Sequence, residues 1–489
     1  MTKNLARLFY NSLEKNNLQS ILSNKINNNW KYTNRDQLNN MINDCCFKLK
    51  EYNIQRGDRI AYKGKNSVEW VAWNLACYSM GAIWVPMYND QNIDQCKFII
   101  NDCQPKVFIS DTKLDVLKLN QLSSEINTCS NTDFSHKSWN DDLATLIYTS
   151  GTTGNPKGVK LSHNNIISNL DSIHNRFGDI KNTTSLNILP WAHIYSLTCE
   201  LYYNLLNDNL TYLCSGKENF MNECREVKPQ VLYIVPKLLE LVKKKIEFLD
   251  KPLIKIVLPI LINLLFGNNL KNIFTGGAKL DDNTKKFYLK NNIIICEGYG
   301  CTETSPMVSV NHLYEPRNDE TVGKLLDKII VKIIDGEICV NGPNVMQGYW
   351  NNEVATKKAF IFEDNKKWYK TGDSGKIENG FLTCQGRISE NYKLNNGKFV
   401  NVAQVENIVR KYLKCNFVVF GENQDSNSIV ADETIESEVL KKINSELDNY
   451  LKIEHVYYID SSKMMEFLTP KLSIKRKKLI NYVITNIIF

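Results

Sequence analysis

The sequence YTSGTTGNPKGVKLSH, from Tyr148 to His163, is the most informative part of this chain. Hydroxyl-bearing residues and glycines alternate through its first half, and a lysine follows at Lys157. Glycines let backbone N–H groups converge on an anion, while hydroxyls and an ammonium group add hydrogen-bond donors. The common NTPase loop GxxxxGK[ST] does not match this order. The stretch therefore predicts a phosphate-binding loop of another type, although its composition alone also fits a flexible turn.

Short apolar runs alternate with segments of helical periodicity on both sides of this loop. The predicted strands are residues 58–62, 82–86, 106–109, 231–235, 271–274 and 293–296. Residues 67–80 and the segment beginning at Pro236 carry apolar side chains at helical spacing, and proline is well tolerated in a first helical turn. This alternation predicts βαβ units and a mostly parallel sheet.

The last third of the chain has a different pattern. Between residues 329 and 349 the apolar period drops towards two, which predicts antiparallel strands. After Arg387 a smaller α+β unit begins, in which the stretch of residues 421–433 is short and polar. The predicted fold is α/β, with a large multi-sheet N-terminal domain at residues 1–386 and a small C-terminal domain at residues 387–489.

The amino-acid composition limits the classes of function that this chain can have. Apolar residues make up 43% and charged residues 23%, as in globular proteins, and the net charge of +7 suits small anionic ligands without supporting nucleic-acid binding. The fourteen cysteines are scattered and form no CxxC spacing, so they predict reduced thiols rather than a metal site. The first residues carry no apolar signal-peptide core, which predicts a cytoplasmic location.

The most apolar stretch, residues 254–266, contains Lys255, Pro259 and Asn263. It is shorter than the roughly 20 apolar residues that a membrane span requires. A run of three lysines at residues 243–245 precedes it, and basic residues beside apolar ones suit an anionic lipid surface. The stretch therefore predicts peripheral membrane contact, with a buried helix as the alternative.

Seven segments resemble, in order, the motifs of the adenylate-forming (AMP-binding) superfamily, which includes acyl-CoA synthetases, luciferases and peptide-synthetase adenylation domains. Besides the loop at 148–163, they are LPWAHIYSL (189–197), TGGAKL (275–280), EGYGCTETSP (297–306), GEICVNGPNVMQGYW (336–350), WYKTGDSG (368–375) and GRISENYKLNNGKFVNVAQVE (386–406). The segment EGYGCTETSP is most similar to long-chain fatty acyl-CoA synthetases.

The resemblance implies a site for ATP and Mg²⁺. Glu303, with Thr152, would place Mg²⁺ on the phosphates, because hard oxygen ligands suit that ion. Tyr299 would stack on adenine, and the carboxylate of Asp373 would accept both ribose hydroxyls. The residues implied to bind ATP are Thr149, Ser150, Gly151, Thr152, Thr153, Gly154, Lys157, Gly276, Gly277, Ala278, Glu297, Gly298, Tyr299, Gly300, Thr302, Asp373 and Arg387.

Further residues are implied outside the nucleotide site. His193 would lie beside the pocket for the acid, although a lone histidine is more often an ordinary core residue. Ser389 occupies the family's hinge position, two residues after Arg387. Lys393 and Gly397 would lie on the side of CoA, which is the co-substrate.

The C-terminal segment departs from the family pattern. The family's catalytic lysine follows a Thr-Pro-rich turn, and the aligned position here is Ser473. Lys471 and Lys475 lie two residues to either side, and residues two apart on an extended segment point to the same face. Both are therefore catalytic candidates, and Lys475 is favoured because Arg476 retains the basic pair that follows the lysine in the family.

The leading hypothesis is an ATP-dependent long-chain fatty acid–CoA ligase that forms acyl-AMP and then acyl-CoA. One alternative keeps adenylation but uses a carrier protein or another carboxylic acid. A second alternative is a non-catalytic nucleotide- or acyl-binding protein, because the C-terminal lysine is displaced.

Overall fold

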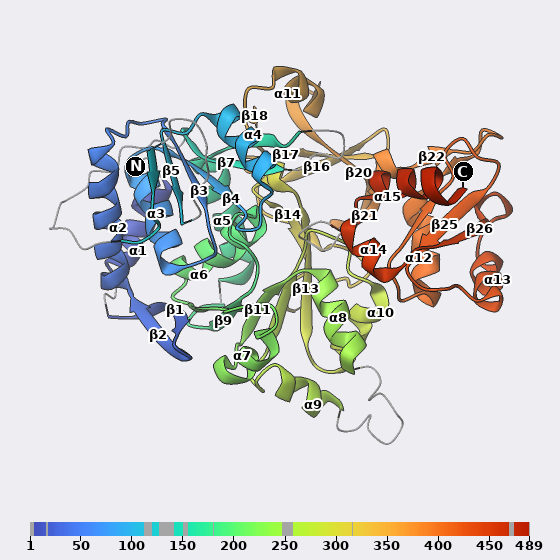
Figure 1. Cartoon of the computed structure of the whole chain (residues 1–489), viewed down its shortest axis with the longest axis horizontal. Helices are drawn as coiled ribbons and strands as arrows, with labels where there is room; N and C mark the ends of the chain where they lie inside the picture. The colour runs from blue at the N-terminus through green and yellow to red at the C-terminus, as the bar shows by residue number, and fades with distance from the viewer. Residues whose placement is uncertain are drawn as a thin grey trace.

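The computed structural model describes residues 4–15, 18–111, 120–126, 141–149, 155–178, 180–246, 258–314, 316–468 and 474–488. Within these residues the chain forms a 14-stranded sheet, a seven-stranded sheet and two small sheets (Figure 1). The predicted α/β class is confirmed.

The seven-stranded sheet contains the parallel units predicted before the phosphate loop. Its order is β18-β8-β7-β4-β3-β5-β6, and β4 and β5 both pair in parallel with β3. The strands are β3 (Arg59–Lys63), β4 (Ile83–Met87), β5 (Val107–Ser110), β6 (Asn120–Leu122), β7 (Leu143–Thr149), β8 (Lys157–Ser162) and β18 (Gly348–Tyr349). Crossovers α3 (Val68–Ser79) and α4 (Ile93–Cys103) join β3, β4 and β5. Ser67 caps α3 by accepting from the N–H of Trp70, and nearly every residue of α3 is buried.

The 14-stranded sheet changes character along its length. Its centre, β9 to β13, is parallel, and its end from β13 to β16 is antiparallel, as the drop in apolar period predicts. Its strands are β1 (Ser20–Ile26), β2 (Asn29–Asn34), β9 (Thr184–Asn187), β10 (Leu210–Leu213), β11 (Val231–Ile234), β12 (Asn272–Thr275), β13 (Ile294–Gly300), β14 (Met307–Val310), β15 (Lys324–Leu325), β16 (Ile330–Ile334), β17 (Glu337–Asn341), β19 (Phe360–Glu363), β20 (Lys366–Glu378) and β21 (Phe381–Arg387).

Helices pack against both large sheets. They are α1 (Leu5–Leu13), α2 (Arg35–Glu51), α5 (His163–Phe177), α6 (Tyr203–Leu206), α7 (Phe220–Val227), α8 (Pro236–Ile246), α9 (Leu258–Leu265), α10 (Asp282–Lys290) and α11 (Glu353–Ala359). A π-helix, η1 (Ser196–Tyr202), precedes α6, and all its residues are buried. Single π turns inside helices occur frequently at functional sites.

The C-terminal residues form the lobe at the right of Figure 1. Its elements are η4 (Ile388–Glu390), β22 (Tyr392–Lys393), β23 (Phe399–Val400), α12 (Val402–Tyr412), β24 (Phe417–Phe420), β25 (Asn427–Ala431), α13 (Ser437–Ser445), β26 (Ile453–Tyr458), α14 (Ser461–Glu466) and α15 (Arg476–Val483). Buried side chains between residues 392 and 453 form a core of their own. The domain boundary at residue 386, one residue before the end of β21, stays a prediction.

Residues 421–433 are short and polar, but the structure places a buried strand within them. They contain β25, which is buried throughout and pairs with β24 and β26. Its polar residues find partners: Tyr392 donates to Asn427, and Asn427 donates to the backbone carbonyls of Tyr450 and Lys452. A polar sequence can therefore form a central strand once its hydrogen bonds are satisfied.

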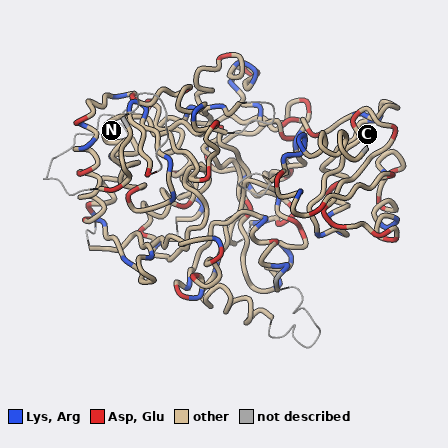
Figure 2. The backbone as a smooth tube through the Cα atoms, in the orientation of Figure 1, with Lys and Arg blue, Asp and Glu red and all other residues tan. Residues whose placement is uncertain are grey.

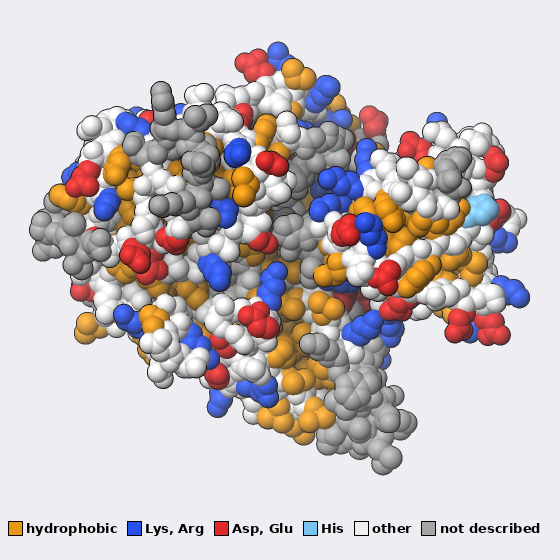
Figure 3. Space-filling model, viewed as in Figure 1, with side chains coloured by type: hydrophobic (Ala, Val, Ile, Leu, Met, Phe, Trp, Pro, Cys, Tyr) orange, Lys and Arg blue, Asp and Glu red, His pale blue; other side chains and the backbone are white. Residues whose placement is uncertain are grey.

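The apolar stretch after the three lysines forms α9, with Ile262 buried and Ile260 and Leu264 exposed. Orange side chains gather beside this helix in Figure 3. Lys243 is buried, and Lys244 pairs with Glu433, so these two lysines face other parts of the chain. Among the helices of the described residues, none is both long and apolar enough to cross a bilayer. Basic and acidic residues are interspersed along the described backbone (Figure 2), and membrane contact stays a prediction.

Candidate functional site

The predicted phosphate loop connects two antiparallel strands. Thr149 at the end of β7 lies opposite Lys157 at the start of β8, so the base of the loop is fixed by strand pairing. The loop residues Ser150, Gly151, Thr152, Thr153 and Gly154 lie outside the described residues. The structure therefore describes the loop only at its two ends, up to Thr149 and from Asn155 to Lys157.

Tyr349 connects Lys157 to Glu303, and the sequence analysis did not single out this tyrosine. The Lys157 ammonium lies 5.2 Å from the ring centroid of Tyr349, and the Tyr349 hydroxyl donates a 2.9 Å hydrogen bond to Glu303. A cation over an aromatic face is attracted by the ring's electron density. We call Lys157, Tyr349 and Glu303 the phosphate-side group. It joins the predicted triphosphate lysine to the predicted magnesium ligand.

Strand pairing puts this group together. Tyr349, on the two-residue strand β18, pairs with Val159 of β8, which places it beside Lys157. Glu303 lies in the short 3-10 helix η3 (Thr302–Thr304), and its carbonyl accepts from the N–H of Met346. Burial raises the pKa of the Tyr349 hydroxyl, and the nearby Glu303 carboxylate raises it further. Tyr349 therefore stays a neutral donor towards Glu303.

A second group forms where β13, β20 and β21 meet. Asp373 lies opposite Arg387 in the antiparallel pair β20–β21, and its carboxylate is 3.0 Å from the Arg387 Nε. Tyr299 donates a 2.7 Å hydrogen bond to the other carboxylate oxygen. We call Tyr299, Asp373 and Arg387 the ribose-side group. Burial raises the pKa of Asp373, although Arg387 and the Tyr299 hydroxyl oppose the shift.

The glycines predicted on the adenine side lie at the ends of neighbouring parallel strands. Gly276, Gly277 and Ala278 follow β12, beside β13. A Cβ on Gly300 would lie 1.8 Å from the carbonyl oxygen of Pro306, and one on Gly298 would lie 2.7 Å from the sulfur of Met307. The approach to the backbone requires glycine at Gly300, whereas at Gly298 the Met307 side chain would have to move. Thr302 is buried, and no hydrogen bond of its hydroxyl is described.

Glu297 is engaged within the protein. Its side chain is 4% exposed, and its carboxylate pairs with Lys285 at 2.5 Å and accepts from the N–H of Leu280. The carboxylate thus ties the loop that follows β12 to strand β13. The structure gives Glu297 a role in holding this loop, and its contact with ATP stays a prediction.

His193 lies just before the π-helix η1 and is partly buried. Its Nδ1 accepts from the N–H of Tyr195, and the ring of Tyr195 packs near Gly276. The segment is therefore close to the adenine-side loop. The backbone N–H of Trp191, two residues before His193, donates to Asn66, which the sequence analysis did not single out.

The C-terminal candidates are not brought to either group. Lys475 is exposed at the start of α15, and no partner of its ammonium occurs among the described residues. Leu468 and Ile474 form an isolated antiparallel bridge, and Lys471 and Ser473 lie outside the described residues. Arg476 pairs with Glu406 at 2.7 Å and lies 3.7 Å from Glu390, next to Ser389.

The predicted hinge and CoA-side residues lie on the surface of the C-terminal lobe. Ser389 is exposed in η4, Lys393 is exposed on β22, and Gly397 is exposed in the following turn with a φ of +79°. Among the described residues, no side-chain hydrogen bond or ion pair joins these three to the phosphate-side or ribose-side group. Their roles stay predictions.

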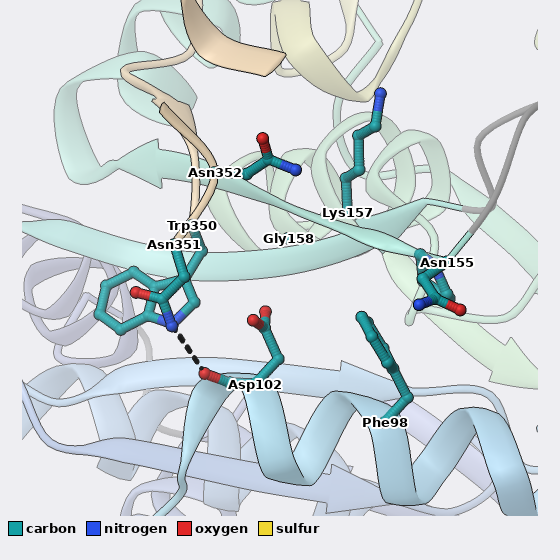
Figure 4. A pocket seen from close by; sticks show the side chains of 9 residues that line it. Phe98, Asp102, Asn155, Lys157, Gly158, Trp350, Asn351 and Asn352 are labelled. Atoms are coloured by element: carbon teal, nitrogen blue, oxygen red, sulfur yellow. Dashed lines mark hydrogen bonds between the residues drawn. The ribbon is translucent and has the colours of Figure 1, made fainter. Parts of the chain in front are cut away.

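A cavity of about 270 Å³ adjoins the end of the phosphate loop, with Phe98, Asp102, Asn155 and Trp350 in its wall (Figure 4). It contains neither Glu303 nor any member of the ribose-side group. In Figure 4 the Lys157 side chain extends away from Phe98 and Asp102. Lys157 also lines this cavity, so the cavity adjoins the phosphate-side group at that residue.

Comparison with known proteins agrees with this geometry. The family described as AMP-binding enzyme matches residues 19–350. The chain belongs to this family. Long-chain-fatty-acid–CoA ligase FadD15 of Mycobacterium bovis is 27% identical over 452 residues, which cover 78% of this chain and 74% of that protein. Long chain acyl-CoA synthetase 6, peroxisomal, of Arabidopsis thaliana is 26% identical over 486 residues, covering 80% and 67%.

Solved structures of AMP-binding enzymes share the fold. The crystal structure of ATP-bound MatB from Rhodopseudomonas palustris superposes with a TM-score of 0.82 at 22% identity, and the match covers 98% of this chain and 99% of that one. At that identity the likeness speaks for the fold alone. The predicted superfamily and its architecture are confirmed, and the substrate is taken up below.

Proposed function

We propose that this AMP-binding enzyme activates a long-chain fatty acid with ATP and then transfers the acyl group to CoA. Its family and its relatives named as fatty-acid–CoA ligases support an acid–CoA ligase activity. The observation that carries the proposal is that Tyr299 and Glu303 belong to one short segment. Tyr299, at one end of this segment, belongs to the ribose-side group, and Glu303, at the other end, belongs to the phosphate-side group. ATP laid along it would meet both.

In the first step, a carboxylate oxygen of the acid bonds to the α-phosphorus of ATP, and pyrophosphate leaves with the β- and γ-phosphates. Negative charge grows on the α-phosphoryl group, and fixed cations stabilise that charge. Lys157 on the phosphate side and Arg387 on the ribose side would supply such cations. Lys475, or else Lys471, would approach with the C-terminal lobe.

Glu303 has the chemistry of a magnesium ligand. One carboxylate oxygen accepts from Tyr349, and the other has no partner among the described residues. Hard carboxylate oxygens suit Mg²⁺, and Thr152 would supply a hydroxyl oxygen. Mg²⁺ that arrives with ATP would neutralise phosphate charge. Tyr349 would orient the carboxylate.

In the second step, the CoA sulfur bonds to the acyl carbon, its proton passes to solvent, and AMP leaves. Lys393 and Gly397 would lie on the CoA side after the C-terminal lobe turns about Ser389. Such a rotation requires only a few residues to absorb the change in φ and ψ.

A second candidate is the same activation of a shorter acid that carries a polar group. The Tyr195 hydroxyl and the Thr198 hydroxyl are buried without a hydrogen-bond partner among the described residues. Both belong to the segment that follows His193. Buried hydroxyls normally find a partner, so a polar group on the acid would satisfy them better than an alkyl chain.

Pyrophosphate exchange, measured with and without CoA, tests these proposals. We expect exchange with a long-chain fatty acid in the absence of CoA, and acyl-CoA once CoA is added. Exchange with a small dicarboxylic or aromatic acid alone would favour the second candidate. Exchange without thioester formation would indicate a carrier-protein acceptor, and no exchange with any acid would favour a non-catalytic binding protein.

A further inference from the structure

The cavity beside the end of the phosphate loop combines a carboxylate with an aromatic ring. Phe98 and Asp102 are four residues apart on α4, so they lie on the same face of that helix. In Figure 4 both side chains point from α4 towards the strand that carries Gly158. The volume of about 270 Å³ is near the lower end of the range for ligand pockets, roughly 300 Å³. The cavity therefore has space for a small molecule between a negative charge and an apolar surface.

The charge of Asp102 is not balanced by another side chain. Asp102 is the last residue but one of α4, where the helix dipole disfavours an anion. One carboxylate oxygen accepts a 2.5 Å hydrogen bond from the Tyr148 hydroxyl. The other has no hydrogen-bond or ion-pair partner among the described residues. The carboxylate and the negative end of the helix together attract a cation.

The two nearest cationic side chains are engaged elsewhere. Arg59 donates to the last carbonyls of α4, and its guanidinium lies 5.7 Å from the ring centroid of Trp350. Lys157 extends away from Asp102 in Figure 4, and its ammonium lies over the ring of Tyr349. Neither forms an ion pair with Asp102. A cation that neutralises this carboxylate would therefore come from solution.

The wall of the cavity suits an organic cation better than a metal ion. In the described part of the chain, no three His, Cys, Asp or Glu side chains gather in a group that could hold a metal ion. Phe98 instead offers a ring that attracts a cation and packs against carbon. Asn351 donates to the backbone carbonyl of Asp102, which leaves its side-chain oxygen as an acceptor in the same wall. An ammonium group has three N–H donors for such acceptors.

We propose that this cavity binds a small primary amine, with its ammonium group on Asp102 and its carbon chain against Phe98 and Trp350. The side-chain oxygens of Asn155 and Asn351 would accept the remaining N–H groups. The ligand differs in charge from every substrate of the proposed reaction, because ATP, CoA and the carboxylic acid are all anions.

Tyr148 links this cavity to the phosphate loop. Its hydroxyl bonds to Asp102, and it directly precedes Thr149, after which the loop begins. It also pairs with Gly158 across the base of the loop, where a Cβ on Gly158 would lie 2.9 Å from the tyrosine ring. An amine on the Asp102 carboxylate would compete with the Tyr148 hydroxyl. Amine and ATP would then affect each other's binding, because coupling between two sites is reciprocal.

Calorimetric titration of the full chain with n-butylamine tests the site and requires no catalytic activity. We expect saturable binding in the millimolar range, weakened about tenfold or more in Asp102→Asn, because a charge-assisted hydrogen bond is lost. Asparagine keeps the shape of the side chain and the oxygen that accepts from Tyr148. The matched control is Asp94→Asn, in the exposed first turn of the same helix, which should leave binding unchanged.

Two further comparisons separate charge from apolar contact. n-Butanol has the same carbon chain without the charge and should bind at least about tenfold more weakly than n-butylamine. Phe98→Leu keeps an apolar wall without the ring and should weaken amine binding about threefold. The proposal would be overturned by an absence of saturable binding, by equal affinity in Asp102→Asn and the unchanged chain, or by equal affinity for n-butanol. Displacement of n-butylamine by an equimolar amount of K⁺ would also overturn it, in favour of an inorganic cation.

The coupling to the phosphate loop has a separate readout. The Kd for ATP, measured by calorimetry with and without saturating n-butylamine, should differ at least about twofold. Tyr148→Phe removes the hydroxyl that joins the two sites and should abolish this difference. An unchanged Kd for ATP, or a difference that persists in Tyr148→Phe, would overturn the coupling. Because this readout measures binding, it is independent of whether the chain forms acyl-CoA.

Discussion

The nucleotide side and the C-terminal lysine segment hold their candidate residues in different ways. Glu303 and Asp373 each accept a hydrogen bond from a tyrosine, and Asp373 also pairs with Arg387. Lys475 is exposed and has no side-chain partner among the described residues. The nucleotide side is therefore preorganised before any ligand binds. In the proposed mechanism, a movement of the C-terminal lobe would bring Lys475 to the site.

The largest effect is expected at the preorganised side. Glu303→Gln keeps the shape of the side chain but removes the charge that would hold Mg²⁺, so pyrophosphate exchange should fall about 1,000-fold. The free energy of unfolding should change by less than about 1 kcal/mol, because the side chain is only partly buried. Glu378→Gln, on the exposed end of β20, serves as the matched control. A large loss of stability with ATP binding retained would make Glu303 structural.

A smaller loss of activity is expected from substitutions in the C-terminal lysine segment. Lys475→Ala should lower pyrophosphate exchange about 100-fold, because an ammonium would be missing beside the developing charge. Lys471→Ala is the matched control and should cost less. If the two losses are reversed, Lys471 is the delivered lysine. Full activity in both variants would show that neither lysine reaches the phosphate.

The delivery itself can be tested at Ser389. Replacement by proline fixes φ and removes a backbone donor, so Ser389→Pro should lower thioester formation about tenfold more than adenylation. The two half-reactions are measured separately, as pyrophosphate exchange and as acyl transfer from preformed acyl-AMP. Equal loss in both would contradict the hinge. Ser437→Pro, at the first residue of α13, controls for a proline on the same lobe.

Tyr349 offers a finer test of preorganisation. Tyr349→Phe removes the hydrogen bond to Glu303 but keeps the ring under Lys157, and exchange should fall about fivefold, corresponding to roughly 1 kcal/mol. Tyr349→Leu removes both contacts and should cost more. If phenylalanine and leucine have the same effect, the cation–aromatic contact contributes nothing.

The smallest effect concerns pH. Because burial raises the pKa of Asp373 in the folded protein above its ordinary value near 3.8, the folded state holds this proton more tightly than the unfolded chain. The contribution of Asp373 to stability therefore falls as pH rises from that value through the folded pKa, and is constant above it. Urea unfolding at a series of acidic pH values should show this slope in the native chain and not in Asp373→Asn. An opposite slope would mean that the ion pair with Arg387 outweighs burial.

Much of the fold could be predicted because local patterns determine it. The predicted strands at 58–62, 82–86 and 106–109 lie within one residue of β3, β4 and β5, since each contains at least three consecutive apolar residues. Tyr299 and Asp373 are joined by a hydrogen bond, and the roles of both residues and of Glu303 stay predictions. The apolar periodicity and the order of the motifs can both be recognised from the sequence alone.

The remaining features depend on pairings between distant segments. Tyr349 joins the site only because the two residues of β18 pair with β8, and no periodicity marks so short a strand. Arg476 stands in the basic run at residues 475–478, and its side chain lies near both Glu390 and Glu406. The ion pair of Glu297 with Lys285 at 2.5 Å could not be predicted, because nothing in the sequence marks these two residues as partners.

The π-helix η1, directly after His193, has a consequence for how this protein can vary. A π turn closes its hydrogen bonds over one residue more than an α turn, so the segment already accommodates an extra residue. Loss of a single codon there would leave an ordinary α-helix and rotate the side chains on one side of it by about 100° against those on the other. A deletion of one residue would thus change which side chains of this segment face the predicted acid pocket. The strands that carry the phosphate-side and ribose-side groups would keep their register.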